Sequence, residues 1–352
     1  MVRLLIAASG TGGHLFPALA LAECLPDYHI EWLGVRDRLE KTLVGAHYPL
    51  HTIEVEGFQS RNPIKILKVL FKLMRAVFQV KKLIKTHQIN MVFTTGGYIA
   101  APAIIAARLS GIKAIIHESN FIPGKVTRLL SRTCDGVALG FKETTQYLPQ
   151  SKTVWVSTPV RSQFYSPQPL DLPIPDNVFL IVVVGGSQGA VSINNLIRQC
   201  AYSWLSEGAY IVHLTGIHDP DGSSLQHPHY FPLHFYDNMA GLLQRANLAV
   251  SRAGAGTLTE LAITQTPAIL IPYPFAAENH QVYNAQIVEK AGAALVYRQE
   301  EITPEILENS VLKLLKNCDQ LQKMANKAGT LAVFDSAQQL AKMIEEMIIP
   351  KV

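Results

Sequence analysis

Short apolar runs alternate with segments of helical periodicity along almost the whole chain. Such runs, rich in β-branched residues, are typical of buried parallel strands, and the 3.6-residue spacing is typical of helices packed on them. We expect strands at residues 2–8, 29–33, 91–94, 114–117, 136–138 and 154–156, and again at 179–184, 210–214, 229–233, 248–251, 268–271 and 294–296. The alternation predicts an α/β fold with doubly wound parallel sheets.

The length of the chain divides this pattern into two domains. Its 352 residues exceed the roughly 250–300 residues that one hydrophobic core usually serves. A proline-rich segment from Pro159 to Pro175 separates the two sets of strands. We therefore expect an N-terminal domain over residues 1–160 and a C-terminal domain over residues 161–335. Residues 336–352 have helical character, and we expect them to pack back onto the first domain.

The composition is that of a folded protein, with 48% hydrophobic and 16% charged residues. Its four cysteines are widely spaced and form no Cys-x-x-Cys pair, which disfavours a zinc knuckle or a disulfide framework and favours a reduced, cytosolic compartment. The sequence contains no uncharged run of about 18 apolar residues, which argues against a membrane-spanning helix. The opening apolar stretch leads into a glycine turn rather than a signal-peptide cleavage site.

Charge is distributed unequally between the two halves. Residues 1–160 contain 19 Lys and Arg against 10 Asp and Glu, whereas the remainder contains 12 against 17. No acidic residue occurs from Gly57 to His117. Within this stretch, the segment from Ile64 to Lys85 has cations at three-, four- and seven-residue steps, which place them on one helical face: Lys65, Lys68, Lys72, Arg75 and Lys82.

The same segment is amphipathic. We expect its aromatic residues Phe71 and Phe78 at the margins of the basic face and the remaining apolar residues opposite the cations: Ile66, Leu67, Leu70, Leu73, Met74, Val77 and Ile84. Such a helix suits an anionic lipid surface. The alternative is an ordinary helix packed on its sheet, with a solvated basic face. Nucleic-acid binding is disfavoured because the aromatic residues do not lie among the cations.

Two glycine-rich turns lie about half a chain apart. Residues 9–14 read Ser-Gly-Thr-Gly-Gly-His and residues 185–190 read Gly-Gly-Ser-Gln-Gly-Ala, and each sequence joins a predicted strand to a predicted helix. Glycine lets the backbone approach a ligand closely, and the helix N-terminus offers free N–H groups to an anion. The pair indicates a ligand held from both sides of a cleft.

The first turn departs from the dinucleotide-binding fingerprint. That fingerprint needs a third glycine three residues after the second and an acidic residue about 20 positions further on. Here Gly12 is followed by Gly13, His14 and Leu15, and residues 32–36 read Trp-Leu-Gly-Val-Arg. A nicotinamide or flavin cofactor is therefore disfavoured.

His14 is the side chain of this turn with catalytic chemistry. An imidazole with an ordinary pKa of about 6.5 can act as a general base toward a hydroxyl nucleophile. The alternative is a structural histidine that caps the helix or bonds a neighbouring loop.

The second half offers groups that suit a nucleotide. Ser187 and Gln188, with the N–H groups of their turn and the helix dipole, suit a diphosphate. Another glycine turn at residues 252–257 precedes Glu260, whose carboxylate can accept two hydrogen bonds from a ribose diol. The alternative for Glu260 is a capping box with Thr257.

Together these motifs resemble the MurG family of bacterial glycosyltransferases, which add N-acetylglucosamine to undecaprenyl-diphosphate-linked N-acetylmuramoyl-pentapeptide and so convert lipid I to lipid II. The matching residues span nearly the whole chain: 10–18, 96–98, 117–120, 123–124, 159–161, 185–190, 237–239, 252–260, 280–281 and 284–285. The resemblance implies the GT-B architecture, with two Rossmann-like domains that face a central cleft. The first would bind the lipid acceptor and the second the donor, with no cofactor and no metal in the chemistry.

The resemblance also implies roles for individual residues. On the donor side these are Thr11, Gly12, Gly13, Asn120, Arg161, Ser187, Gln188, Gly189, Tyr236, Ala255, Glu260, Gln281 and Asn284. On the acceptor side they are Thr11, His14 and Tyr98. The residues expected at the membrane are Lys65, Lys68, Phe71, Lys72, Arg75 and Phe78.

Within the donor set, the family pattern gives each group a part of the nucleotide sugar. Ser187, Gln188 and Gly189 hold the diphosphate. Glu260 binds the ribose, and the backbone near Tyr236 binds uracil. Arg161 balances the charge of the leaving diphosphate. The sugar hydroxyls are read by Asn120, Ala255, Gln281 and Asn284.

Four positions depart from the usual family sequence. Ser119 replaces Gln, Thr158 replaces Asn, Ala253 replaces Ser, and Ala8-Ser9 replaces a Gly pair. Each change removes or alters a possible hydrogen bond. The departures therefore affect the sugar contacts rather than the class of reaction.

The implied reaction inverts the donor linkage. His14, or a water that it positions, takes the proton from the C4 hydroxyl of the muramoyl sugar while that oxygen attacks the anomeric carbon of UDP-N-acetylglucosamine. Fixed dipoles and Arg161 stabilise the departing UDP. Asp219-Pro220-Asp221 has the Asp-x-Asp form of metal-dependent glycosyltransferases, but its Gly- and Ser-rich surroundings favour a solvated loop.

The expected partners are UDP-N-acetylglucosamine, undecaprenyl-linked lipid I, an anionic membrane surface and proteins of cell-wall synthesis or division, with no nucleic acid. The expected location is the cytoplasmic face of the bacterial inner membrane, in peripheral attachment. The alternatives are another GT-B glycolipid glycosyltransferase, a UDP-N-acetylglucosamine 2-epimerase and a non-catalytic nucleotide-sugar-binding protein.

Overall fold

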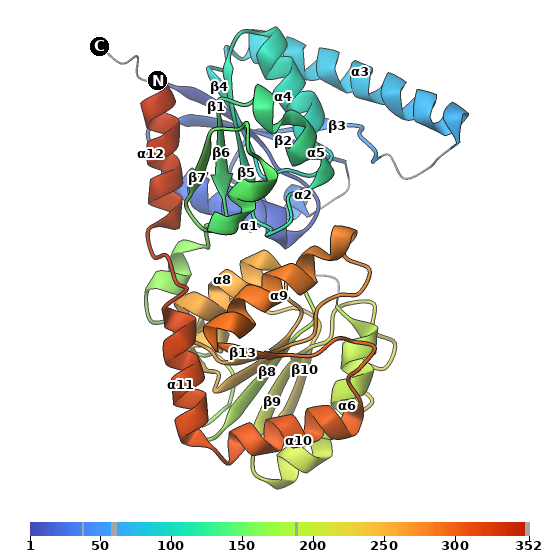
Figure 1. Cartoon of the computed structure of the whole chain (residues 1–352), viewed down its shortest axis with the longest axis vertical. Coiled ribbons are helices and arrows are strands. Elements are labelled where there is room, and N and C mark those ends of the chain that lie inside the picture. The colour runs from blue at the N-terminus through green and yellow to red at the C-terminus, as the bar shows by residue number, and fades with distance from the viewer. Residues whose placement is uncertain (37–38, 58–61, 187–188, 349–352) are drawn as a thin grey trace. The chain divides into compact units, whose positions relative to one another are not determined.

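The protein contains two units, each built on its own parallel sheet. The computed structural model describes residues 1–36, 39–57, 62–186 and 189–348 (Figure 1). Unit 1 comprises Met1–Arg161 and Asp335–Val352, and unit 2 comprises Ser162–Phe334. The boundary expected from the sequence lies one residue earlier.

Seven strands form the sheet of unit 1, in the order β3-β2-β1-β4-β5-β6-β7, and all neighbouring pairs are parallel. The strands are β1 (Arg3–Ala7), β2 (His29–Val35), β3 (Leu50–Ile53), β4 (Met91–Thr94), β5 (Lys113–Glu118), β6 (Gly136–Leu139) and β7 (Thr153–Trp155). The helices are α1 (Gly12–Glu23), α2 (Glu40–Leu43), α3 (Pro63–Thr86), α4 (Ala100–Leu109), α5 (Lys125–Leu130) and α12 (Ser336–Ile348), with 3-10 turns η1 (Ser131–Thr133) and η2 (Lys142–Tyr147).

Alternate residues of β1 enter two separate cores, because successive strand side chains point to opposite faces. Leu4 and Ile6 pack with α1 and α12, whereas Leu5 and Ala7 pack with α3 and α4. The C-terminal helix α12 contacts α1 and contributes Leu340 to the first of these cores. The sheet of unit 1 is thus covered on both faces, as near-continuous apolar strands require.

Six parallel strands form the sheet of unit 2, in the order β10-β9-β8-β11-β12-β13. The strands are β8 (Leu180–Val184), β9 (Tyr210–Leu214), β10 (Tyr230–Leu233), β11 (Leu248–Ser251), β12 (Ala268–Leu270) and β13 (Ala294–Val296). The helices are α6 (Val191–Ser206), α7 (Met239–Arg245), α8 (Ala255–Ile263), α9 (His280–Ala291), α10 (Pro304–Leu315) and α11 (Cys318–Gly329), with 3-10 turns η3 (Ser162–Tyr165) and η4 (Ala277–Asn279).

The doubly wound parallel sheets predicted from the sequence are confirmed, and each predicted strand is present. The strand that sequence analysis missed is β3, which reads Leu-His-Thr-Ile and lacks an apolar run. It forms at the sheet edge by pairing in register with β2. No helix among the described residues is both long and apolar enough to cross a bilayer.

Candidate active site

Both glycine turns lie where the strand order of their own sheet reverses. In unit 1 the reversal falls between β1 and β4, and in unit 2 it falls between β8 and β11. Open parallel sheets bind ligands outside the carboxyl ends of their strands at such a reversal. The two turns follow β1 and β8, so the topology of each unit supports a ligand site at its turn.

The first turn places three of the predicted residues at the start of α1. Thr11 is the N-cap residue of this helix and is exposed, as is Gly13, while Gly12 is buried. His14 follows in the first helical turn and is half-buried, and its backbone N–H donates to the Thr11 carbonyl at 3.0 Å.

The His14 ring is fixed by a contact across the sheet reversal. Its Nδ1 lies 2.8 Å from the carbonyl oxygen of Thr95, the residue after β4. Since a carbonyl only accepts hydrogen bonds, Nδ1 carries the proton and Nε2 presents a lone pair. This is the tautomer that a general base requires. His14 therefore does bond a neighbouring loop, as the alternative held, but this hydrogen bond uses Nδ1 and leaves the Nε2 lone pair for general-base chemistry.

Gly96 and Gly97 border the His14 ring. Their φ angles are +88° and +72°, which glycine adopts without strain. A Cβ atom at Gly97 would lie 3.6 Å from Nε2. The next residue, Tyr98, is 52% exposed, and its ring lies so close to Gly57 that a Cβ there would be 2.1 Å from Cζ. Glycines thus shape both the His14 and the Tyr98 surroundings.

Arg161 is connected to the first turn through Phe16. The guanidinium carbon lies 4.3 Å from the centroid of the Phe16 ring, a cation–π contact. Gly12 admits this ring, because a Cβ atom at Gly12 would lie 2.7 Å from Phe16 Cε2. The structure therefore brings Gly12 and Arg161, far apart in sequence, into one local arrangement.

Glu118 organises the loop that carries Asn120. Its carboxylate, 6% exposed, accepts hydrogen bonds from the Asn120 backbone at 3.1 Å and side chain at 3.3 Å. It also accepts from the Gly124 backbone at 2.9 Å and from the Thr127 hydroxyl at 2.7 Å. Glu118 has no role among the predicted site residues, and its position at the end of an apolar strand is the signal that could have identified it.

Two of the departures from the family sequence are accommodated around His117. Burial lowers the pKa of this imidazole, and its Nε2–H donates to the Ser157 carbonyl at 2.9 Å. The remaining nitrogen, Nδ1, accepts from the Ser119 hydroxyl at 3.3 Å. Thr158 packs over Gly140, where a Cβ atom would lie 2.8 Å from the Thr158 Oγ1. Both replacement residues are buried, so they act on loop packing.

The second turn has the backbone of an anion site. Gly186 and Gly189 have φ angles of +94° and +78°, and the N–H of Gly189 donates to the Gly186 carbonyl at 2.9 Å. A Cβ atom at Gly189 would lie 2.4 Å from the Thr215 carbonyl oxygen, so this position requires glycine. Ser187 and Gln188, predicted to hold the donor diphosphate, lie outside the described residues.

Arg252 supports the turn between β11 and α8. Its buried side chain donates to the carbonyls of Ile271 and Pro272 and to the side chains of Ser192 and Gln299. Burial lowers its pKa to about 10. The guanidinium ties the turn to neighbouring segments, a role that sequence analysis did not assign.

Gln281 and Asn284, on α9, meet the same turn. The Gln281 Oε1 accepts from the backbone N–H groups of Ala253 at 3.2 Å and Tyr273 at 3.0 Å. The Asn284 side chain is fully buried and donates to the Ala253 carbonyl at 3.3 Å. Ala255 is the first residue of α8. The structure thus brings Gln281 and Asn284 to the turn that precedes Ala255.

The capping-box alternative for Glu260 is wrong. Helix α8 begins at Ala255 and its N-cap residue is Gly254, so Thr257 lies inside the helix. Glu260 is half-buried one turn further on. Tyr236, expected near uracil, donates its phenol hydrogen bond to Asp171 in the described structure.

The comparisons with known proteins agree over both units. Models of the glycosyltransferase family 28 N-terminal and C-terminal domains match residues 4–139 and 180–343. A protein of Rippkaea orientalis named UDP-N-acetylglucosamine–N-acetylmuramyl-(pentapeptide) pyrophosphoryl-undecaprenol N-acetylglucosamine transferase is 73% identical over 99% of both chains. The crystal structure of Acinetobacter baumannii MurG has a TM-score of 0.79 at 31% identity, covering 98% of this chain and 100% of that one. The chain belongs to the MurG family.

Membership of the MurG family confirms the GT-B architecture expected from the sequence. The fold extends to more distant proteins: the glycosyltransferase of kitacinnamycin has a TM-score of 0.76 over 99% of both chains at 15% identity. At that identity the likeness concerns the fold alone. The assignment of the chain to the MurG family therefore depends on the relatives of higher sequence identity.

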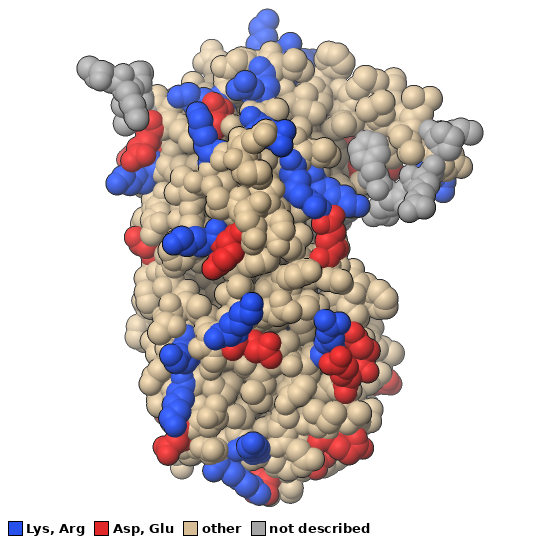
Figure 2. Space-filling view, in the orientation of Figure 1, with Lys and Arg blue, Asp and Glu red and all other residues tan. Residues whose placement is uncertain are grey.

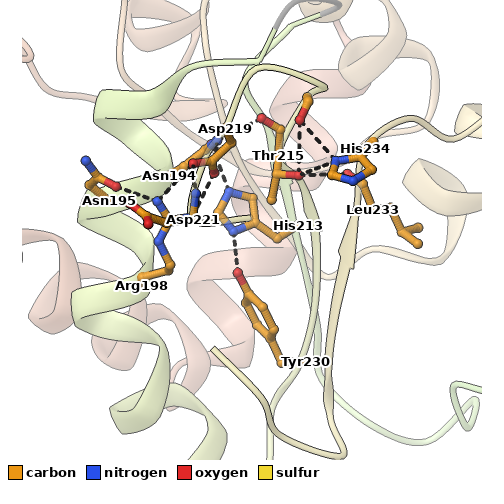
Figure 3. A network of polar contacts seen from close by, with 11 residues as sticks. Asn194, Asn195, Arg198, His213, Thr215, Asp219, Asp221, Tyr230, Leu233 and His234 are labelled. Carbon is orange, nitrogen blue, oxygen red and sulfur yellow. Dashed lines mark hydrogen bonds and ion pairs between the residues drawn. The ribbon is translucent and has the colours of Figure 1, made fainter. Parts of the chain in front are cut away.

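In this MurG-family chain, the expectation that Asp219 lies in a solvated loop is wrong. Its carboxylate is buried, pairs with Arg198 at 2.7 Å and accepts from the Asn194 side chain at 2.7 Å (Figure 3). Burial raises the pKa of Asp219, but the hydrogen bonds from Arg198 and Asn194 outweigh this effect and hold it below its ordinary value. Its oxygens are engaged within unit 2, so Asp219 does not act as an open metal ligand.

Helix α3 presents a different face from the one predicted. Leu67, Phe71, Met74 and Phe78 are 67%, 65%, 48% and 70% exposed. The buried side instead comprises Ala76, Val77, Val80 and Ile84, which pack in the core shared with α4. The two phenylalanines therefore lie in the middle of the exposed face, because the helix is rotated relative to the predicted margins.

A shallow groove of about 440 Å³ lies along this exposed face, between apolar and basic side chains: Phe71, Met74, Arg75, Phe78, Gln79 and Lys82. Lys72 pairs with Glu56. Figure 2 shows more Lys and Arg than Asp and Glu on the visible face of unit 1, in line with the composition of residues 1–160. Phe71 and Phe78 thus lie among the cations, so the prediction that separated them, on which nucleic-acid binding was disfavoured, is wrong. Such a face is typical of an interaction surface.

Proposed function

We propose that the chain is an inverting glycosyltransferase that moves N-acetylglucosamine from UDP-N-acetylglucosamine to the C4 hydroxyl of undecaprenyl-diphospho-N-acetylmuramoyl-pentapeptide, so that lipid I becomes lipid II. The observation that carries this proposal is the 73% identity, over 99% of both chains, to a relative whose name states this transfer. The two family 28 domain matches support it.

His14 is the proposed general base. Its Nδ1–H is committed to the Thr95 carbonyl, so its Nε2 lone pair is the atom that would accept the C4 hydroxyl proton. Gly97 keeps a methyl group away from that nitrogen, and the exposed ring of Tyr98, the next residue, is proposed to contact the acceptor. Proton removal during attack raises the nucleophilicity of the hydroxyl oxygen where it is needed.

The leaving diphosphate is proposed to be stabilised by fixed charges and dipoles. Arg161 is a permanent cation held over Phe16, and Gly186 and Gly189 shape the turn before α6. The N-terminus of α6, a helix of 16 residues, adds a partial positive charge. Groups that are already oriented need no reorganisation as charge develops on UDP.

The donor sugar is proposed to contact α8 and α9 of unit 2. Because Gln281 uses its Oε1 on two backbone N–H groups, its amide hydrogens are the part of the side chain left to face a sugar oxygen. Glu118 orients Asn120, and Glu260 is the proposed ribose ligand. No metal is assigned to the reaction.

The exposed face of α3 is proposed to rest on the cytoplasmic leaflet of the inner membrane. Phe71 and Phe78 would enter the headgroup region, and Lys65, Lys68, Lys72 and Arg75 would meet anionic lipid phosphates. This peripheral attachment would bring unit 1 to the surface where the lipid-linked acceptor resides. Partner proteins of cell-wall synthesis or division remain a prediction from the resemblance.

The function is tested by incubating the protein with radiolabelled UDP-N-acetylglucosamine and a short-chain lipid I analogue, with and without EDTA. The proposal predicts one labelled lipid-linked disaccharide per UDP released, at the same rate with EDTA. Release of a free aminosugar without transfer would indicate an epimerase instead. Binding of the donor without any UDP release would indicate a non-catalytic protein.

Membrane attachment is tested with vesicles that contain an anionic phospholipid. Replacing Phe71 and Phe78 by Ser should reduce binding at least tenfold, and Lys68, Lys72 and Arg75 changed to Glu should do the same. Replacing Tyr202 of α6, 60% exposed in unit 2, by Ser is the matched control and should have no effect. Unchanged binding of both α3 variants would show that this face is only solvated.

A further inference from the structure

A buried carboxylate in unit 1 is surrounded by histidines that play no part in the proposed reaction. Glu31 of β2 is 2% exposed. Its Oε2 lies 2.6 Å from Nε2 of His51, in β3, and its Oε1 lies 2.9 Å from Nδ1 of His87, which follows α3. The Nε2 of His29 lies 3.4 Å from the same Oε1.

The ionised state of Glu31 fixes the protons of its two closest partners. Burial raises the pKa of Glu31, but hydrogen bonds from His51 and His87 outweigh this effect and hold the pKa below its ordinary value. A carboxylate only accepts hydrogen bonds, so the nitrogen of each imidazole that faces it carries the proton. His51 Nε2 and His87 Nδ1 thus face the two oxygens of one carboxylate.

Three ligand atoms from Glu31, His51 and His87 lie within 4.8 Å of one another. Among the described residues, no other set of three or more His, Cys, Asp and Glu side chains meets this condition. Zinc bonds to imidazole nitrogen and carboxylate oxygen are about 2.0–2.2 Å, which places tetrahedral ligand atoms about 3.3 Å apart. The contacts of the two histidines to Glu31, at 2.6 and 2.9 Å, are shorter than this spacing, whereas the upper limit of 4.8 Å exceeds it by about 1.5 Å. Shifts of the two imidazoles of up to about 1.5 Å would therefore bring the three atoms to tetrahedral spacing.

We propose that Glu31, His51 and His87 form a binding site for one Zn²⁺ ion, with water at the fourth position. The ligand types select the ion, since imidazole suits zinc whereas Mg²⁺ and Ca²⁺ prefer oxygen ligands. On binding, the proton of each coordinating nitrogen moves to the other nitrogen of its ring or to solvent. His51 and His87 are 28% and 36% exposed, so the ion reaches the site from solution.

The site lies apart from the sequence-predicted active-site residues. His87 follows α3 and precedes β4, so it lies near the amino ends of the strands, whereas the His14 turn follows the carboxyl end of β1. Arg3 of β1 fixes this segment by donating to the His87 carbonyl at 2.8 Å. The ion would tie β2 and the edge strand β3 to the segment after α3. It would thus stabilise the base of the helix whose exposed face carries Phe71 and Phe78.

The test uses the untagged full-length protein and two metal probes. Zn²⁺ binding is measured by titration calorimetry after EDTA treatment and dialysis, and Co²⁺ is added as a spectroscopic probe of tetrahedral coordination. The variants are His51→Ala and His87→Ala, whose side chains are partly exposed. His47→Ala is the matched control, because His47 is exposed in the same unit and makes no contact with Glu31 in the described structure.

The proposal predicts one Zn²⁺ per chain, visible Co²⁺ absorption of tetrahedral intensity and a higher unfolding temperature in zinc than in EDTA. The His51→Ala and His87→Ala variants should each weaken Zn²⁺ binding at least tenfold and abolish the Co²⁺ absorption. The His47→Ala variant should match the wild type. The metal-free unfolding temperatures establish that the variants are folded. Equal zinc affinity in the wild type and in the His51→Ala, His87→Ala double variant would overturn the proposal.

Discussion

Replacing His213 by Gln tests how a buried polar network stabilises unit 2. His213 of β9 is fully buried between Tyr230, at 2.7 Å from Nδ1, and the Asn194 side-chain oxygen, at 3.0 Å from Nε2 (Figure 3). The Asn194 amide hydrogens are used on Thr215 and Asp219, so its oxygen must accept and Nε2 must donate. The neutral imidazole is therefore the form that the network holds.

The magnitude follows from the pKa of this imidazole. Burial, and then the nearby Arg198 cation, lower the pKa of His213 from 6.5 to about 3. Between these values only the unfolded chain binds the proton, so the free energy of unfolding falls as the pH falls. The slope is about 0.7 kcal/mol per pH unit at pH 6.5 and approaches about 1.4 kcal/mol per pH unit below it, which amounts to about 2.3 kcal/mol between about pH 6.5 and pH 4.5.

The assay is equilibrium urea unfolding followed by the fluorescence of Trp204, which lies in the same core as His213's strand. Trp32 and Trp155 of unit 1 are replaced by Phe so that Trp204 alone reports. The range ends at about pH 4.5 because the carboxylate of Asp219, whose pKa is lowered, contributes stability that is lost only as the pH falls further. Gln keeps a donor and an acceptor but does not titrate.

We expect the stability advantage of the wild type over His213→Gln to shrink by about 2.3 kcal/mol from about pH 6.5 to pH 4.5. The control variant His47→Gln, at an exposed position, should track the wild type across this range. A difference between wild type and His213→Gln that stays constant with pH would refute the reasoning, because it would mean that His213 binds a proton equally in both states.

Three further substitutions test the proposed site. Gly97 and Gly111 both have a positive φ, +72° and +70°, so replacing either by Ala should cost about 1–2 kcal/mol of stability in thermal unfolding. Only Gly97→Ala places a methyl group near His14 Nε2, so only this variant should lower kcat for transfer, by at least tenfold. Equal kcat values for the two variants would contradict this role of Gly97. Glu118→Gln should raise the donor KM and lower stability by about 1–3 kcal/mol because the loop loses charged hydrogen bonds, whereas the exposed Glu143→Gln should do neither. Gly57→Ala should raise the acceptor KM by displacing Tyr98, and should have no further effect in a Tyr98→Ala background.

Most of the architecture could be predicted from the sequence because parallel strands buried on both faces are continuous apolar runs. Strand β3 escaped because Leu50-His51-Thr52-Ile53 contains two polar residues, one of which contacts Glu31. Its strand conformation depends on pairing with β2, which is a tertiary effect. Periodicity read in one dimension cannot supply such a partner.

The candidate site was predictable in its turns and in His14, but not in the residues that orient them. Periodicity located the basic helix but misplaced Phe71 and Phe78, because the angle of α3 on its core is set by Val77, Val80 and Ile84 packing with α4. Likewise, the loop composition around Asp219 gave no sign of the buried Arg198 that pairs with it. Both errors come from contacts between segments distant in sequence.

The central claim is that His14, through its Nε2 lone pair, is the general base. Its most direct test is the kcat of the His14→Ala variant for transfer of N-acetylglucosamine to the short-chain lipid I analogue. The account predicts a fall of about 10²–10⁴-fold with the donor KM near that of the wild type. His47→Ala, at an exposed position of the same unit, should retain wild-type kcat. A His14→Ala kcat within about threefold of the wild type would contradict the account.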